Sequence, residues 1–216
     1  MFLGVDLGTS SVKLLLADDE GRILDSASGR YPLSFPEDGW AEQSPEDWYA
    51  AVVKCVRELG VRHPLSEVRG VSFSGQMHGL VVLDAEDNVI RPAILWNDNR
   101  TAEECAFLND EVGKKELLAR TGNVAFTGFT APKLLWMKKH EPENFARIAK
   151  IMLPKDYIAY KMSGVFASDM SDDSGTLYFD VKNGKWSAPM LELIGISEDM
   201  LPAVFPSTAA VGSASA

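Results

Sequence analysis

An acidic residue and a loop of small polar residues separate two apolar runs at the start of the chain. Residues 2–7 and 11–17 are mainly apolar, and Asp6 lies near the end of the first run. A buried carboxylate without a partner is costly, so Asp6 is expected at a strand end that faces a cleft or a cation. Residues 8–11 supply hydroxyls and closely spaced backbone N–H groups, which form concavities that hold anions. This pairing favours Mg²⁺ bound together with a phosphate, because Mg²⁺ prefers one or two carboxylates plus phosphate oxygens.

The loop itself has two interpretations. In the first, the loop is a phosphate-binding hairpin, in which Gly8 is expected to let the turn adopt a positive φ. Asp, Gly and Ser are also ordinary turn formers, so a purely structural turn stays open. The chain contains no G-x-x-x-x-G-K-[ST] and no G-x-G-x-x-G after a strand. The two commonest nucleotide-binding fingerprints are therefore excluded.

A second polar cluster follows the apolar run 68–73. Gln76 and His78 lie there between two glycines, which allow close backbone approach, and their side chains are directional donors and acceptors of the kind a polyol needs. A turn with a solvated glutamine and a capping histidine is the alternative. A metal site at His78 is disfavoured, because His63 and His140 show no ligand spacing with it.

The third polar cluster ends another short apolar run. Residues 94–100 read Ile-Leu-Trp-Asn-Asp-Asn-Arg, so Trp96 precedes four hydrogen-bonding side chains. An aromatic face beside polar groups is a common arrangement for binding the C–H surface of a sugar. A core tryptophan followed by an Asn/Asp turn and a helix cap at Thr101 is the alternative, and the residues alone leave both open.

Hydrophobic periodicity predicts a β-rich start and then alternating strands and helices. A third antiparallel strand is expected over residues 22–29, after a turn at 18–21. The clearest helix has Ser44 as its N-cap, and its apolar stripe is expected to end at Gly60. The further expected elements are strands over 68–73 and 80–83, a turn over 84–88, a helix opened by a capping box of Thr101 and Glu104, and helices over 132–139 and 143–150.

Three hairpin strands, a helix and a strand that can lie beside the first form a ββαβ pattern. This pattern predicts an α/β fold of the ribonuclease-H-like type, a mixed sheet with helices on its faces. The hairpin residues 6–10 resemble those of the superfamily of actin, sugar kinases and heat-shock ATPases, which implies the same fold. Ligands of open α/β sheets bind beyond the carboxyl ends of strands. We therefore expect the loops that follow strands 2–7 and 68–73 to lie at the mouth of a cleft.

Composition is that of an ordinary packed protein, with 216 residues and 46% apolar content. No apolar run approaches the ~20 residues of a membrane span, and no signal sequence precedes the first strand, so we expect a cytoplasmic protein without membrane contact. Cys55 and Cys105 are expected to be buried free thiols. The net charge of -10 argues against nucleic acid as a partner. It also repels polyphosphates, so a nucleotide site must depend on local amide dipoles and Mg²⁺.

Taken in order, the three clusters resemble the N-terminal domain of the FGGY carbohydrate kinases. Residues 6–13, 75–79 and 92–98 carry the resemblance. The Met-His-Gly version of the second motif resembles family members that act on D-xylulose, whereas glycerol kinases carry Arg-Glu at that place. The resemblance covers almost the whole chain and continues through residues 121–123, 128–136, 153–157 and 167–172.

The resemblance implies ATP-dependent phosphorylation of D-xylulose at O5. Asp6 would help position Mg²⁺ and the γ-phosphate of ATP. The groups that meet the phosphates would be Gly8, Thr9, Ser10, Ser11 and Lys13. The ketose site would be formed by Gln76, Met77, His78 and Trp96. Residues 154–157 and 168–172 also match the family, and we expect them to be framework that holds the cleft wall.

The chain departs from the family in length. An FGGY kinase is roughly twice as long, has two domains, and uses as general base an Asp in a Gly-Gly-x-Asp motif that residues 1–216 do not contain. We therefore expect residues 1–216 to be the N-terminal, sugar-side domain, truncated before that motif and before the nucleotide-side domain, and inactive alone. A homodimer is an expectation for the full-length protein. The alternatives are a kinase for another ketose or polyol, such as ribulose or gluconate, and a non-catalytic sugar-binding module if the gene ends here.

Overall fold

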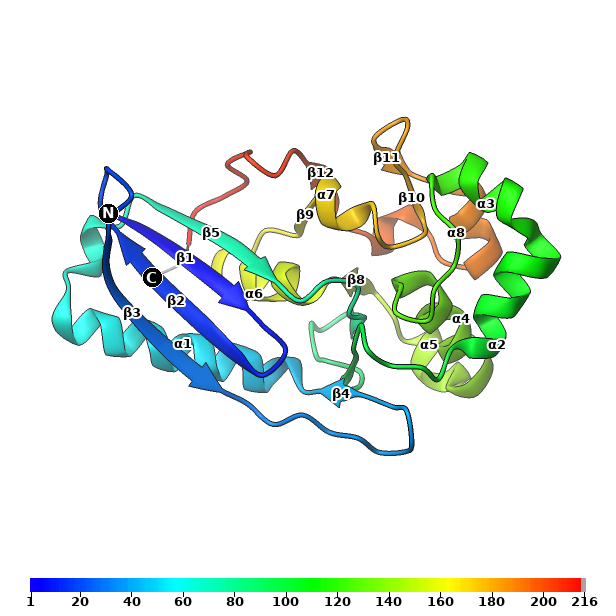
Figure 1. Ribbon diagram of the computed structural model, residues 1–216, viewed down its shortest axis with the longest axis horizontal. Coiled ribbons are helices and arrows are strands. Elements are labelled where there is room, and N and C mark those ends of the chain that lie inside the picture. The colour runs from blue at the N-terminus through cyan, green and yellow to red at the C-terminus, as the bar shows by residue number, and fades with distance from the viewer. Residues whose placement is uncertain (215–216) are drawn as a thin grey trace.

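One mixed sheet organises the N-terminal part of the computed structural model, which describes residues 1–214. In the strand order β3-β2-β1-β5, the first three strands are antiparallel and β5 runs parallel to β1. Figure 1 shows this sheet on the left, and it is the arrangement that the ββαβ pattern predicted. Its strands are β1 (Phe2–Leu7), β2 (Ser11–Ala17), β3 (Ile23–Arg30) and β5 (Gly70–Gly75).

Helix α1 (Pro45–Arg62) packs against this sheet and begins where the sequence predicted. Ser44 is its N-cap, and the Ser44 side chain accepts a hydrogen bond from a backbone N–H of the first turn. The predicted end at Gly60 is wrong, because the helix continues to Arg62, whose guanidinium contacts Asp25 at 2.7 Å. A glycine inside a helix costs only about 1 kcal/mol, which packing in the folded chain readily offsets.

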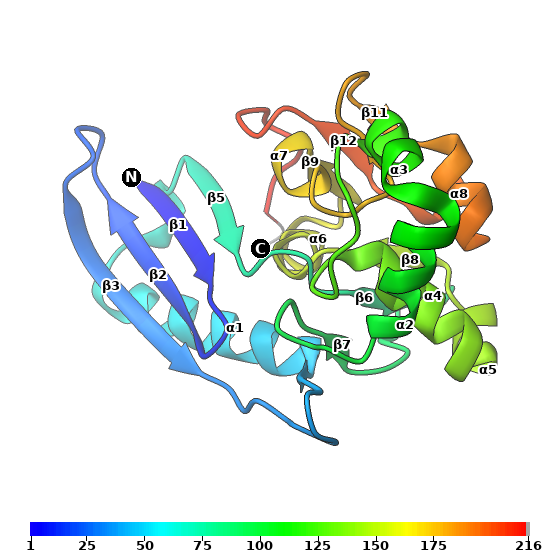
Figure 2. The same ribbon diagram turned by 45° about the vertical axis from the view of Figure 1, so that its right-hand side comes forward.

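Most of the remaining elements form a second lobe of short helices and two-stranded sheets, on the right of Figure 1 and from another side in Figure 2, whereas helix α6 contacts α1 and β5. Its strands pair as β4 with β7, β6 with β8, β9 with β12 and β10 with β11. The helices of the rest of the chain are η1 (Leu65–Glu67), α2 (Ala102–Ala106), η2 (Phe107–Gly113), α3 (Lys114–Thr121), α4 (Thr130–His140), α5 (Pro142–Ala146), α6 (Pro154–Ser163), α7 (Met170–Asp173), α8 (Ala188–Ile194) and η3 (Glu198–Met200). The strands are β4 (Glu42–Gln43), β6 (Val81–Leu83), β7 (Ala93–Ile94), β8 (Lys150–Met152), β9 (Ala167–Asp169), β10 (Phe179–Asp180), β11 (Lys185–Trp186) and β12 (Ala203–Phe205).

Strand β6 separates two hydrophobic cores. Val81 and Leu83 belong to the core between the sheet and α1, whereas Leu80 and Val82 belong to the core of the second lobe. Successive side chains of a strand point to opposite faces, so one fully apolar strand can serve both cores. This position fixes the loop of residues 76–79, which connects β5 to β6.

The prediction of a helix over residues 143–150 is wrong for the second half of that segment. Helix α5 ends at Ala146, and Lys150–Met152 forms strand β8, which pairs antiparallel with β6. Ile151 and Met152 are buried in the two different cores. Tertiary pairing with β6 therefore overrides the local helical pattern.

The capping box predicted at Thr101 does not form, although helix α2 begins there. Thr101 makes no side-chain cap hydrogen bond, and its hydroxyl instead donates to the carbonyl of Thr127 at 3.1 Å. Glu104 is buried, and its Oε2 has no hydrogen-bond partner among the described residues. The helix predicted to begin at 132 begins earlier, at Thr130.

Both cysteines are buried free thiols, as the sequence predicted. Burial is the main reason why the pKa of Cys105 is raised to about 11 and why the pKa of Cys55 is also raised. Over residues 1–214, no helix has the length and apolar character needed to cross a membrane.

Candidate functional site

Asp6 lies at the end of strand β1 on the solvent-facing side of the sheet. Its neighbours in register are Lys13 on β2 and Ser74 on β5, so both adjoining strands place a polar side chain beside the carboxylate. The alternation of buried and exposed residues along β1 turns Asp6 away from the core that holds Val5 and Leu7. The carboxylate is therefore available to a ligand at the end of the sheet where β1 and β5 both end.

The loop after Asp6 is tight, but for a different reason from the one predicted. Gly8 does not adopt the positive φ that the sequence suggested. Its N–H donates to the carbonyl of Ser11 at 3.0 Å, and a Cβ at position 8 would lie 3.1 Å from that same oxygen. The Tyr31 hydroxyl donates to the Gly8 carbonyl, and burial followed by the charge of Asp6 raises the pKa of Tyr31. Close backbone approach, rather than a left-handed conformation, favours glycine here.

A relay of side-chain amides connects this loop to the second polar cluster. The Nε2 of Gln43 donates to the carbonyls of Thr9 at 2.7 Å and Pro32 at 3.2 Å, which fixes the orientation of the amide. The Oε1 of Gln43 then accepts from the Trp48 indole and from the Nε2 of Gln76, each at 3.1 Å. Because the Nε2 of Gln76 is its donor to Gln43, the Oε1 of Gln76 is left as a free acceptor.

Two buried polar atoms of the second cluster have no partner. The Oε1 of Gln76 and the Nδ1 of His78 are both buried, and neither has a hydrogen-bond partner among residues 1–214. An unpaired buried polar atom costs about 1–3 kcal/mol. Between them in the chain, Met77 is 50% exposed. The segment therefore combines two unused hydrogen-bonding atoms with an accessible apolar side chain, which suits a ligand that carries both hydroxyl and C–H groups.

The backbone of His78 is strained and held from several sides. His78 has a φ of 61°, which is uncommon for a residue with a Cβ. Its carbonyl accepts from the hydroxyl of Thr130 at 3.2 Å and from the Nζ of Lys133 at 2.8 Å. Its ring centroid lies 4.7 Å from that of Phe129. Strained backbone that is fixed by its surroundings is typical of functional sites.

The His78 imidazole is neutral near physiological pH. Burial, followed by the nearby charge of Lys133, lowers the pKa of His78 to about 4, and the backbone of Gly175 opposes part of this shift. A neutral imidazole has one donor and one acceptor nitrogen. His78 can thus pair with one hydroxyl in either sense, without bringing a charge into the site.

Trp96 is a surface residue of the site rather than a core tryptophan. It is 45% exposed, and its indole N–H donates to the hydroxyl of Thr9 at 3.1 Å. This contact brings the third polar cluster against the loop that follows Asp6. On its other side, Gly128 lies so close that a Cβ there would be 2.6 Å from the Trp96 carbonyl oxygen.

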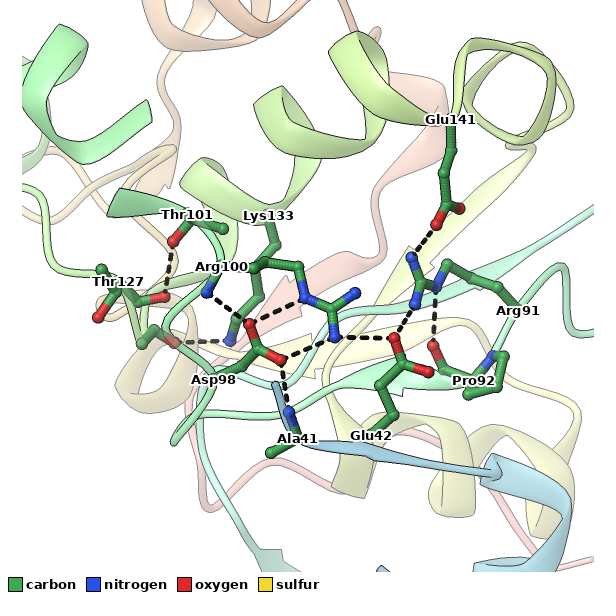
Figure 3. A network of polar contacts seen from close by, with 11 residues as sticks. Ala41, Glu42, Arg91, Pro92, Asp98, Arg100, Thr101, Thr127, Lys133 and Glu141 are labelled. Atoms are coloured by element: carbon green, nitrogen blue, oxygen red, sulfur yellow. Dashed lines mark hydrogen bonds and ion pairs between the residues drawn. The ribbon is translucent and has the colours of Figure 1, made fainter. Parts of the chain in front are cut away.

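Two of the polar residues after Trp96, Asp98 and Arg100, have buried side chains that pair with one another. Asp98 is fully buried and accepts hydrogen bonds from the backbone N–H of Ala41 at 2.6 Å and from the guanidinium of Arg100 at 2.8 and 2.9 Å. Arg100 also forms an ion pair with Glu42 at 2.8 Å, and Glu42 forms a further ion pair with Arg91 (Figure 3). Of the two interpretations that the sequence left open for this cluster, the buried pairing favours the structural turn for Asp98 and Arg100, because both side chains already have hydrogen-bond partners.

The residues expected to be framework form a second charged cluster. The Nζ of Lys155 contacts Asp156 at 2.5 Å, Asp169 at 2.8 Å and Asp172 at 3.4 Å. Asp169 is also the N-cap of α7 and accepts from two backbone N–H groups. Burial lowers the pKa of Lys155, but the surrounding carboxylates outweigh it, so the pKa is raised overall. Helix starts and caps, as predicted for these segments, are thus locked together by one ammonium group.

The structure brings the three predicted clusters together. The Gln43 side chain forms hydrogen bonds with both Thr9 and Gln76. The Trp96 indole donates a hydrogen bond to the same threonine. Asp6 and Lys13 are paired in register on the adjoining strands β1 and β2. Four residues of the site were missed from the sequence, namely Gln43, Phe129, Lys133 and Gly175. A lysine within the apolar run Thr-Ala-Pro-Lys-Leu-Leu-Trp was a visible signal for a buried ammonium.

The fit of this site to Mg²⁺ depends on phosphate. No group of three or more His, Cys, Asp or Glu side chains within the described part of the chain is arranged to hold a metal ion. Asp6 by itself suits the kind of Mg²⁺ site in which one carboxylate, water and substrate phosphates complete the coordination.

Comparison with known proteins gives one consistent result. The N-terminal domain of the FGGY family of carbohydrate kinases matches residues 1–216. The chain is 44% identical over 213 residues to "Xylulose kinase" of Escherichia coli (strain K12), covering 99% of this chain and 44% of that protein. "Xylulose kinase" of Bacillus subtilis (strain 168) is 43% identical over 213 residues, covering 98% of this chain and 42% of that protein.

The solved structures give the same picture of the fold. A crystal structure described as a xyloylose kinase from Brucella ovis superposes with a TM-score of 0.95 at 43% identity, covering 100% of this chain and 45% of that one. A xylulose kinase from Rhodospirillum rubrum has a TM-score of 0.94 at 30% identity, covering 100% of this chain and 45% of that one. The chain therefore spans less than half the length of the relatives it matches, and it has their ribonuclease-H-like α/β fold.

Proposed function

The chain belongs to the FGGY family of carbohydrate kinases, and on this basis we propose that it is the sugar-side part of an enzyme that phosphorylates D-xylulose at O5 with ATP. The observation that carries the proposal is the pair of unpartnered buried atoms, the Oε1 of Gln76 and the Nδ1 of His78, beside the exposed side chains of Met77 and Trp96. The names of the relatives support xylulose as the acceptor.

The sugar is bound by complementarity of polar and apolar groups. The Oε1 of Gln76 accepts a hydrogen bond from one ketose hydroxyl, and the Nδ1 of His78 pairs with a second. Met77 and Trp96 cover the C–H surface of the sugar. A site that offers hydrogen bonds to hydroxyls rejects analogues that leave its own polar atoms unpaired, which gives selectivity among similar polyols.

The loop after β1 holds the phosphate end of the reaction. Asp6 and the loop 8–11 face the end of the sheet, and the side chains of Lys13, Ser10 and Ser11 are available to phosphate oxygens near Asp6. Bound Mg²⁺ would supply neutralisation of the charge on the phosphoryl groups. Phosphoryl transfer depends mainly on alignment and charge stabilisation, so Asp6 and the loop residues act by orienting the γ-phosphate toward the sugar.

The remaining parts of the reaction belong to residues outside this chain. We propose that the whole protein includes a nucleotide-side domain and a general base that takes the proton from the attacking hydroxyl. The lengths of the relatives, of which the chain covers 42 to 45%, support this division. In that arrangement the sugar lies between the two domains, on the side where Trp96 and Thr9 meet.

The test is the substitution His78→Ala in the full-length protein, with kcat/KM measured for D-xylulose and D-ribulose and Kd measured for ATP. Loss of one hydrogen-bonding contact is expected to lower kcat/KM for D-xylulose about ten- to a hundredfold, with little change in ATP affinity. His63→Ala is the control, because His63 pairs with Asp25 of strand β3 at 2.8 Å and belongs to none of the three polar clusters.

Two results contradict the proposal in different ways. If the KM for D-xylulose and its ratio to that for D-ribulose stay unchanged in His78→Ala, the sugar does not contact this residue. If the unmodified protein prefers ribulose or gluconate, the proposed acceptor is wrong, while the assignment of the sugar site can still be tested with the preferred sugar.

A further inference from the structure

Lys133 on helix α4 is a fully buried cation without an acidic partner. Its side chain has 0% exposure, and none of the described carboxylates forms an ion pair with its Nζ. Burying an ammonium is expensive, and such groups are nearly always paired with a carboxylate. An ammonium retained at this cost needs an explanation in terms of what it holds.

The Nζ of Lys133 donates to two backbone carbonyls from different segments. One is the carbonyl of His78 at 2.8 Å, and the other is the carbonyl of Gly128 at 2.7 Å. Figure 3 shows the ammonium directed at a backbone carbonyl beside the Asp98 network. A hydrogen bond from a charged donor is shorter and stronger than one from a neutral donor. Lys133 therefore fixes the spacing between residues 78 and 128.

One of these two carbonyls belongs to a segment that carries a proposed sugar contact, and the other belongs to a segment that packs against such a contact. His78 belongs to the loop 76–79, whose strained conformation depends on what its carbonyl binds. Gly128 lies directly against the Trp96 backbone, with a would-be Cβ only 2.6 Å from the Trp96 carbonyl oxygen. Gly128 thus packs against the backbone that carries the Trp96 side chain, and the His78 carbonyl is part of the residue that carries the imidazole.

We propose that Lys133 is a positioning residue that couples the His78 loop to the Gly128–Trp96 wall and so sets the width of the sugar site. This inference rests on the proposed function only in naming a sugar as the ligand of that site. Lys133 does not touch the ligand. It acts through the backbone of His78 and Gly128.

The electrostatic surroundings agree with this geometry. Burial lowers the pKa of Lys133 to about 7, with the charge of Arg100 acting in the same direction and that of Asp98 opposing it. Both protonation states keep at least two N–H donors. The two carbonyls are therefore bound on either side of neutral pH.

The test compares Lys133→Met with Lys138→Met in the full-length protein. Lys138 lies on the same helix and also donates to a backbone carbonyl, that of Ile194 at 2.8 Å, but this contact is far from the site. Kinetics use the sugar that the unmodified protein phosphorylates best, so a wrong choice of D-xylulose is detected separately. Amide hydrogen exchange is followed for residues 76–80, 126–130 and 192–196.

Lys133→Met is expected to raise the KM for the sugar about ten- to a hundredfold, while kcat and the KM for ATP change less than about threefold. Hydrogen exchange should accelerate in both segments 76–80 and 126–130 together. Lys138→Met should leave the sugar KM unchanged and affect only residues 192–196. An unchanged sugar KM in folded Lys133→Met, faster exchange in only one of the two segments, or an equal loss of all kinetic parameters would overturn the inference.

A second variant keeps the test decisive if Lys133→Met does not fold. Thr130→Val removes the other side-chain donor to the His78 carbonyl and leaves Gly128 untouched. We expect a smaller rise in the sugar KM and faster exchange in residues 76–80 alone. A Thr130→Val protein with unchanged sugar KM and unchanged exchange would show that the His78 carbonyl does not control the site.

Discussion

Gly175 lies directly against the imidazole of His78. A Cβ built on Gly175 would come within 2.2 Å of the His78 Cε1 and 2.6 Å of its Nδ1, far inside any real contact. Gly175 does not have a positive φ, so its backbone conformation does not require glycine. Glycine is required there because a Cβ would occupy the space of the His78 ring. The turn after α7, 97 residues further along the chain, therefore forms one wall of the position that His78 occupies.

We expect Gly175→Ala to displace the His78 ring and raise the KM for the sugar about tenfold or more in the full-length protein, with a smaller change in the KM for ATP. Gly60→Ala is the matched control, since a Cβ there would meet a Leu65 side chain at an ordinary 3.4 Å and alanine favours helix α1. Steady-state kinetics with both substrates measure the effect. An unchanged sugar KM in Gly175→Ala would mean that the His78 ring is not held in a binding position.

Asp6→Ala in the full-length protein is expected to lower kcat on the order of 10²-fold or more, with a smaller change in the sugar KM. Loss of one preorganised electrostatic group aimed at the transferring phosphoryl group typically has this size. Asp199→Ala, at an exposed aspartate of η3, is the control. A normal kcat in a folded Asp6→Ala protein would show that Asp6 has only a structural role in the turn.

Asp173 is a buried carboxyl group that the surrounding donors cannot fully pair. The Ser168 hydroxyl lies 2.8 Å from both an Asp156 oxygen and an Asp173 oxygen, but it has one proton to donate. Lys155 forms its ion pairs with other carboxylates. The second oxygen of Asp173 has no hydrogen-bond partner among the described residues. Burial, followed by the charge of Asp156, raises the pKa of Asp173 to about 8. A protonated Asp173 can donate to Ser168, which then donates to Asp156.

This shift predicts how stability depends on pH. The folded-state pKa of Asp173 is raised from 3.8 to about 8, so its contribution to stability is fully present below about pH 4 and is lost as the pH rises toward 8. Urea unfolding should show the free energy of unfolding of the unmodified protein falling relative to Asp173→Asn over this range, by up to about 1.4 kcal/mol per pH unit. The depressed pKa values of His78 and Lys133 act in the opposite direction but equally in both proteins. A difference between the two proteins that does not vary with pH would contradict a protonated Asp173.

Residues 1–216 alone are not expected to phosphorylate D-xylulose with ATP. Without a positioned general base a rate loss of about 10²- to 10⁴-fold is typical, and loss of nucleotide alignment adds to it. A coupled assay on the purified chain measures this directly, with the full-length protein as the control. Turnover near the median of about 10 s⁻¹ for ordinary enzymes would show that the chain contains a complete active site.

Elements whose patterns are local could be predicted from the residues alone. The hairpin around residues 2–17, helix α1 from its Ser44 cap, and the order of the three polar clusters were all readable, because strand alternation, capping and motif spacing act over a few residues. The family followed from the same motifs. The exposure of Trp96 and the end of α1 at Arg62 could not be predicted from local patterns, since both depend on which other segments of the folded chain pack against them.

The tertiary structure decided everything that depends on contacts between distant segments. Strand β8 exists because β6 pairs with it, and the Oε1 of Gln76 is free because Gln43, 33 residues earlier, has taken the other end of its amide. Asp98 is indistinguishable from an ordinary turn aspartate until its burial is known. Burial and hydrogen-bond pairing are properties of the packed chain as a whole, so they set which of the candidate polar groups remain available to a ligand.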